Sequence, residues 1–101
     1  MIYGPDFLSN AIHARCAESI TGPWSNQLVI YNVPELIPGE TNYNRTNFSY
    51  GAREHPAFVN AVKSETIITY DCNSSDFNRL VHAMEIYTPR TLRFDVSKVC
   101  P

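Results

Sequence analysis

Long apolar runs and an excess of charge of either sign are both missing from this sequence of 101 residues. No stretch approaches the roughly 20 apolar residues that a membrane-spanning helix needs, so we expect no membrane partner. Charged residues make up only 18% of the chain and the formal net charge is -2, without the basic excess that nucleic acid attracts. The sequence therefore predicts that neither nucleic acid nor a membrane is a partner.

Several signatures of chemistry are missing as well. The cysteines form no C-x-x-C pair, and His13 and His82 fit no metal-ligand spacing. No phosphate-binding loop and no Ser-His-Asp order can be found. We therefore predict no metal site and no cofactor. The start, from Met1 to Asp6, lacks the charged and apolar regions of a signal peptide, so we expect no export signal within this chain.

The cysteine count is odd, with Cys16, Cys72 and Cys100 far apart in the chain. An odd count leaves either one free thiol or one bridge to chain that lies elsewhere. The length allows a single domain, residues 1–101, near the low end of what buries an independent core. The odd cysteine, the short length and the missing export signal together predict a fragment of a larger protein.

Glycosylation sequons are more frequent than the composition predicts. They begin at Asn44, Asn47 and Asn73, where chance would give about one. Their number predicts glycosylation at these three asparagines and an extracellular location, as part of a secreted parent protein.

Period-2 alternation and closely spaced turn residues predict an all-β fold. The predicted strands cover residues 10–18, 27–33, 55–62, 65–72 and 91–97. The third and fourth form a hairpin across Lys63 and Ser64. We expect a long polar loop at 38–51 and, after Asp76, a loop with one helical turn. Such an antiparallel meander fits about one blade of a β-propeller plus a neighbouring strand, or a small open sheet or sandwich.

Four phrases, taken in order, resemble a known group of proteins. They are GPW at 22–24, YGAREHP at 50–56, ITYDCN at 68–73 and YTPRTLRFDV at 87–96. The first is typical of a turn in five-bladed β-propellers of glycoside hydrolase family 43 and its relatives. The ordered set is similar to the carboxy-terminal blade of the domain of unknown function 4185. The resemblance implies that four blades lie outside this chain, and that its partners are those blades or further copies of itself.

The resemblance also implies a site for a carbohydrate ligand. In such propellers the first residues of the innermost strands point into an axial funnel, which would hold Arg53, Glu54 and His55. Glu54 would be the catalytic general acid, with Arg53 and His55 binding sugar hydroxyls or tuning its charge. Asp71 would line the rim of the funnel. The competing structural interpretation makes these residues a surface pair, a hydrogen-bonded strand-start histidine and a turn aspartate.

Aromatic residues supply further sugar-binding candidates. Trp24 would stack on a pyranose ring or wedge between neighbouring blades. Tyr43, Phe48 and Tyr50 would form an aromatic rim or hold the polar loop in place.

Three functions remain open at this point. The first is a fragment of a secreted, carbohydrate-associated propeller of the glycoside-hydrolase kind. Hydrolysis of a glycosidic bond generally needs two carboxyl groups and this chain offers one, so we expect no activity from it alone. The second is a non-catalytic propeller module that binds glycans or proteins, and the third is an independent small β-sheet interaction protein.

Overall fold

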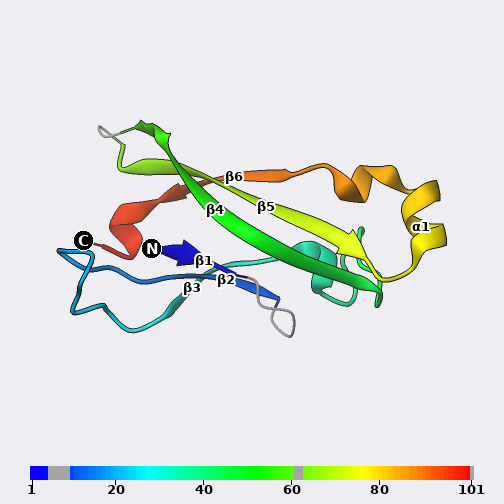
Figure 1. The fold of residues 1–101 in the computed structure, drawn as a ribbon, viewed down its shortest axis with the longest axis horizontal. Helices are drawn as coiled ribbons and strands as arrows, with labels where there is room; N and C mark the ends of the chain where they lie inside the picture. The colour runs from blue at the N-terminus through cyan, green and yellow to red at the C-terminus, as the bar shows by residue number, and fades with distance from the viewer. Residues whose placement is uncertain (5–9, 61–62, 101) are drawn as a thin grey trace.

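Two antiparallel sheets of three strands each form the protein in a computed structural model, which describes residues 1–4, 10–60 and 63–100. Sheet A has the order β1-β2-β3, with β1 at Ile2–Tyr3, β2 at Ala11–Ala14 and β3 at Leu28–Asn32. Sheet B has the order β4-β5-β6, with β4 at Asn47–Asn60, β5 at Glu65–Ser74 and β6 at Arg90–Asp95. Figure 1 shows sheet B above sheet A, with both termini at the same end. The all-β prediction is confirmed.

Helix is confined to short segments between and after the strands. They are η1 at Pro34–Leu36, α1 at Phe77–His82, η2 at Met84–Tyr87 and η3 at Val96–Lys98. Asp76 caps α1, since its Oδ1 accepts a hydrogen bond of 3.3 Å from the backbone N–H of Arg79. The predicted loop with one helical turn is therefore a short helix followed by a 3₁₀ turn.

Strand β5 shows why sheet B has two different faces. Its residues alternate between half-buried and buried along their whole length, and the buried ones include Thr66, Ile68 and Tyr70. Successive side chains of a strand point to opposite faces, so one face of sheet B is inside the protein and the other is outside. We call them the inner and the outer face of sheet B.

The core lies between sheet A and the inner face of sheet B. It consists of Ile12 from β2, Tyr70 and Cys72 from β5, Val33 before η1 and Ile86 in η2. Burying an aliphatic side chain of this kind contributes about 1.5–3 kcal/mol. The two sheets are therefore joined by an apolar layer to which both contribute.

A disulfide joins the segment after β2 to the segment after η3. Cys16 and Cys100 are bonded, with their Cα atoms 5.8 Å apart and a sequence separation of 84. Cys72 is free and buried. The odd count thus resolves into one internal bridge and one thiol in the core, which was one of the alternatives left open by the sequence.

The boundaries predicted for the first long strand and for the polar loop are wrong. The strand predicted for 10–18 covers only Ala11–Ala14, and all four residues are buried, because β2 is the central strand of sheet A. The polar loop predicted for 38–51 ends earlier, because β4 begins at Asn47 and pairs there with Ser74 of β5.

The hairpin predictions are confirmed for the described residues. Strands β4 and β5 pair across a turn that contains Lys63 and Ser64, while the predicted strand positions 61–62 lie outside the described residues. Strand β6 follows Pro89, as expected, and ends at Asp95. There the Asp95 carboxylate accepts a hydrogen bond from the Ser97 N–H and caps η3, so this strand is shorter than the predicted one.

Candidate functional site

The outer face of sheet B carries the side chains that alternate with the buried ones. Residues directly opposite each other in an antiparallel sheet point to the same side, so the strand register identifies the members. They are Phe48, Tyr50, Arg53, His55, Glu65, Ile67, Thr69, Asp71, Asn73, Thr91, Arg93 and Asp95. None of them is buried. This face is therefore open to solvent along all three strands of sheet B.

A bulge in β4 keeps its side chains on this face. Tyr50 is opposite Asp71 and Arg53 is opposite Thr69, so three steps along β4 correspond to two along β5. Gly51 lies in the bulge with φ +69, and a Cβ there would come within 3.3 Å of the Asp71 carboxylate. Glycine adopts that conformation readily and other residues do not. Without the extra residue, Arg53 would point to the inner face.

Polar side chains occupy one end of the outer face. Arg53, Thr69 and Thr91 form one row across the three strands, and His55, Ile67 and Arg93 form the next. The His55 Nε2 lies 2.7 Å from the Thr69 hydroxyl, which joins the two rows by a hydrogen bond. An open groove of about 590 Å³ lies here, and all three strands contribute to its lining.

Aromatic side chains occupy the other end. The Phe48 and Tyr50 rings are 5.9 Å apart between centroids and tilted by 30°, and 41% of Tyr50 is exposed. The Asn73 amide donates a hydrogen bond of 3.3 Å to the Tyr87 hydroxyl, which brings a third ring from η2 to this end. The face therefore combines an aromatic platform with a polar groove.

The structure separates the predicted site residues into two groups. Arg53, His55 and Asp71 lie together on the outer face, whereas Glu54 is opposite Ile68 and belongs to the inner face. The predicted strand start at His55 is wrong, because β4 begins at Asn47 and the Arg53–Glu54–His55 trio lies well inside it. Consecutive residues of a strand point to opposite sides, so this trio cannot converge on one ligand.

The three sequon asparagines differ in how their side chains are used. The Asn44 Oδ1 accepts hydrogen bonds of 2.9 and 2.7 Å from the N–H and the hydroxyl of Thr46, the third residue of its own sequon. The Asn47 amide donates to the carbonyls of Glu35 and Asn42. A glycan on Asn47 would compete with these two bonds, and one on Asn73 would lie over the aromatic end of the outer face.

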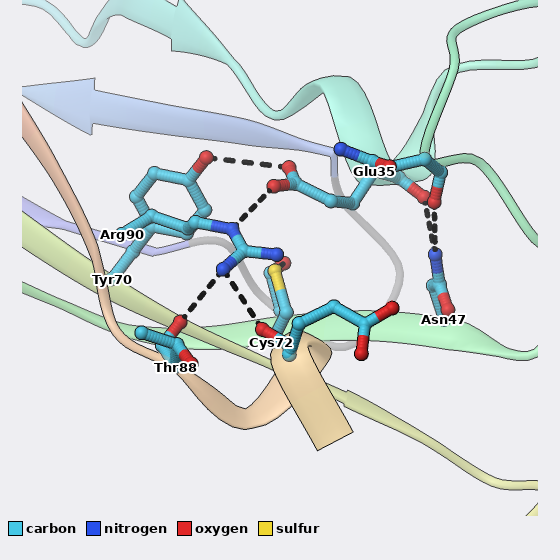
Figure 2. A network of polar contacts seen from close by, with 9 residues as sticks. Glu35, Asn47, Tyr70, Cys72, Thr88 and Arg90 are labelled. Carbon is cyan, nitrogen blue, oxygen red and sulfur yellow. Dashed lines mark hydrogen bonds and ion pairs between the residues drawn. The ribbon is translucent and has the colours of Figure 1, made fainter. Parts of the chain in front are cut away.

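A second polar cluster, on the inner side of sheet B, was not predicted. Figure 2 shows the Glu35 carboxylate between Arg90 and Tyr70. The Arg90 Nε donates to Glu35 Oε1 at 2.8 Å, and the Tyr70 hydroxyl donates to Oε2 at 3.3 Å. Arg90 also donates to the backbone carbonyls of Glu85 and Thr88, each at 3.0 Å. The cluster joins η1, β5 and the segment that leads into β6.

The protonation of this cluster fits a structural role. The hydrogen bond to Glu35 raises the pKa of the Arg90 guanidinium, and burial raises the pKa of the Tyr70 phenol far above its usual range. Burial also raises the pKa of the Cys72 thiol, although its hydrogen bond to Ser49 acts in the opposite direction. A thiol and a phenol held in their neutral forms are poorly suited to act as nucleophile or base.

Two kinds of site were also sought in the described part of the chain. No group of three or more His, Cys, Asp or Glu residues there could hold a metal ion. None of the helices described above is long and apolar enough to span a bilayer.

Fold and site together define an all-β protein with two packed antiparallel sheets and one polar and aromatic sheet face open to solvent. The chain belongs to the family described as Domain of unknown function (DUF5005), whose model matches residues 1–95. A search of curated proteins and a search of solved structures each found no match. The match confirms a domain of unknown function, but it is DUF5005 and not the predicted domain 4185. The relationship to propellers and glycoside hydrolases stays a prediction.

Proposed function

We propose that this protein is a secreted, non-catalytic module that binds a glycan along the outer face of sheet B. The observation that carries the proposal is the continuity of this face, from the Phe48 and Tyr50 rings to the groove beside Arg93. Aromatic rings pack against the apolar faces of sugar rings, and guanidinium, imidazole, carboxylate and hydroxyl groups bind sugar hydroxyls. Both kinds of group are within reach of one extended ligand here.

The position of Glu54 gives no support to the hydrolytic role predicted for it. A glycosidase needs two carboxyl groups on either side of the scissile bond. Glu54 points to the inner face of sheet B and Asp71 to the outer face, so the sheet itself lies between them. The general-acid role predicted for Glu54 gains no partner carboxylate from Asp71.

Secretion is part of the proposal, and the disulfide supports it. Bonds such as Cys16–Cys100 persist in oxidising compartments and are rare in the cytosol. The sequons agree with a passage through a glycosylating secretory route, and the proposed site requires that Asn73 carries no glycan, because a glycan there would lie over the aromatic end of the outer face.

A fragment of a five-bladed propeller is the second candidate. Each sheet is a meander in sequence order, and the two sheets pack face to face as neighbouring blades do. The edge strand β3 exposes 45% of Leu28 and 56% of Val29, and 39% of Trp24 is exposed nearby in the sequence. Further blades or a second copy would cover these side chains.

Light scattering combined with size-exclusion chromatography separates the two candidates. A closed propeller would cover the outer face of sheet B with another blade, whereas a glycan-binding module keeps this face in solvent. A compact monomer with a cooperative melt supports the module. Self-association that is lost on Val29→Lys supports the propeller fragment.

Glycan binding is tested with a panel of neutral and acidic oligosaccharides by isothermal titration calorimetry. Tyr50→Ala should weaken the affinity for a bound oligosaccharide at least about fivefold, since it removes a stacking surface. Glu54→Gln, on the inner face, should leave the affinity unchanged. Two results would refute the proposal. One is that the protein hydrolyses an oligosaccharide and loses this activity on Glu54→Gln, and the other is that Tyr50→Ala leaves the affinity unchanged.

A further inference from the structure

The geometry points to a uronic-acid glycan as the ligand, with its carboxylates bound by Arg53 and Arg93 at the groove end of the outer face. This inference rests on the proposed function and names the class of sugar that the face selects. It starts from the two arginines and the charges around them.

The two guanidinium groups are placed on either side of β5. Arg53 is on β4 and Arg93 is on β6, so their backbones are two strand spacings apart, about 10 Å. Both side chains are exposed, and neither forms a hydrogen bond or an ion pair with another described residue. A guanidinium fork matches the two oxygens of a carboxylate, and such charge-assisted pairs are stronger than neutral hydrogen bonds.

The groove concentrates positive charge in an otherwise acidic protein. Its lining includes Lys63 and Arg93, and Glu65 is the one acidic residue among those that line it. Arg53 adds a third positive charge in the adjacent row. The whole chain has a formal net charge of -2, so this local excess has the opposite sign to the rest of the molecule. An anionic ligand is attracted to such a place.

The centre of the groove fits a sugar ring. Ile67 is half-buried between His55 and Arg93 and offers an apolar surface to the face of a pyranose. The hydroxyls of Thr69 and Thr91 lie in the next row and can bind sugar hydroxyls. Carboxylate, ring face and hydroxyl are the three features of a uronic acid.

The negative charges on the same face favour a carboxylate-bearing glycan over a heavily sulfated one. Glu65, Asp71 and Asp95 are also members of the outer face, so the face as a whole has no positive excess and the attraction for an anion is local to Arg53 and Arg93. A chain with several sulfates per disaccharide would bring negative charge against these carboxylates. One carboxylate per sugar can be matched by Arg53 and Arg93 separately.

Tetragalacturonate and its fully methyl-esterified counterpart provide the test, because they share a backbone and differ in charge. We expect the wild-type protein to bind the acid at least tenfold more tightly than the ester in calorimetry at low salt. Arg93→Gln should weaken binding of the acid roughly tenfold to hundredfold and change binding of the ester less than twofold. Raising the salt to 0.5 M should weaken binding of the acid.

Arg45→Gln is the matched control, because Arg45 is exposed on the loop before β4 and is not a member of the outer face. It removes the same charge and should change neither affinity more than twofold. Thermal melts of both variants check that they are folded.

The outcomes separate this inference from the proposed function. Three outcomes overturn the uronic-acid inference and leave glycan binding standing. They are equal affinity for acid and ester, equal effects of Arg93→Gln and Arg45→Gln, and binding of a sulfated tetrasaccharide without binding of the acid. The inference is also overturned, and glycan binding left standing, if the protein binds a neutral oligosaccharide from the panel and does not bind tetragalacturonate. A folded protein that binds no oligosaccharide of any kind overturns both.

Discussion

Replacing Arg90 by leucine should lower the free energy of unfolding by about 2–4 kcal/mol, because it leaves the Glu35 carboxylate without its cationic partner. The side chain of Glu35 is 6% exposed and that of Arg90 is 25% exposed, with 2.8 Å between Nε and Oε1. Breaking a fully buried pair costs about 3–5 kcal/mol, and the partial exposure of Arg90 lowers the expected cost. The carbonyls of Glu85 and Thr88 belong to exposed residues, so water can replace their lost hydrogen bonds.

Urea unfolding followed by far-UV circular dichroism measures this loss. With a slope of about 1–3 kcal/mol per molar urea, the midpoint should fall by about 1–2 M. Arg93→Leu is the control, since Arg93 is on the same strand, points to the opposite face and forms no hydrogen bond or ion pair with a described residue. Its effect should stay within about 0.5 kcal/mol.

Two results would refute this reasoning. One is an Arg90→Leu variant as stable as Arg93→Leu. The other is a double variant, Glu35→Leu with Arg90→Leu, that loses as much stability as the two single variants added together. Replacing both members of a buried pair by apolar residues removes the unpaired charge, so the double variant should recover much of the loss.

Three further predictions concern the core and the disulfide. Thr66→Val should raise stability by about 1 kcal/mol in urea unfolding, because the buried Thr66 hydroxyl has no hydrogen-bond partner among the described residues; a loss above 1 kcal/mol would show that the hydroxyl is bonded. Reducing Cys16–Cys100, which spans 84 positions, should cost about 3–4.5 kcal/mol, measured on a Cys72→Ala background with and without reductant; an unchanged midpoint contradicts this. Stability should fall as the pH rises above about 8.5 and again above about 10, where the thiol of Cys72 and the phenol of Tyr70 ionise in the unfolded chain. Folding raises both pKa values, so the contribution of these two groups to stability is present in full below those pH values and is lost as the pH rises through the raised pKa values. Cys72→Ala with Tyr70→Phe should flatten the profile of stability against pH. An identical fall in that variant would show that other groups cause it.

Local signals in the sequence were enough to predict much of sheet B. The alternation along 65–72 predicts β5 and its hairpin because a strand with one buried face must alternate. Asp76 is a helix cap wherever the next residues can form a turn. These features depend on neighbours in the chain, so they can be recognised without knowing the fold.

Other features depend on residues that are distant in sequence. Glu35 and Arg90 are 55 positions apart, and nothing near either residue indicates the pair. Residues 47–50 directly follow an Asn-rich loop, and it is the pairing with β5, distant in sequence, that makes them part of β4. The pairing of Cys16 with Cys100 is of the same kind, since three cysteines allow several arrangements.

The candidate site was predicted in part. Arg53, His55 and Asp71 share the outer face, and Phe48 and Tyr50 extend it. Glu54 was grouped with them because it is adjacent in sequence, although alternation along a strand already places it on the other side. The Gly51 bulge decides which residues of β4 share a face, and one glycine in a strand indicates a bulge without giving the register.

Mapping of the bound glycan by NMR tests the central claim most directly. Backbone amide shifts are recorded while tetragalacturonate, or a neutral oligosaccharide that binds, is added to the labelled protein. Binding on the outer face of sheet B predicts that the largest changes fall on Tyr50, Arg53, Asp71 and Arg93 and their strand neighbours. Changes concentrated around Trp24 and the disulfide, or on the inner face, would contradict it.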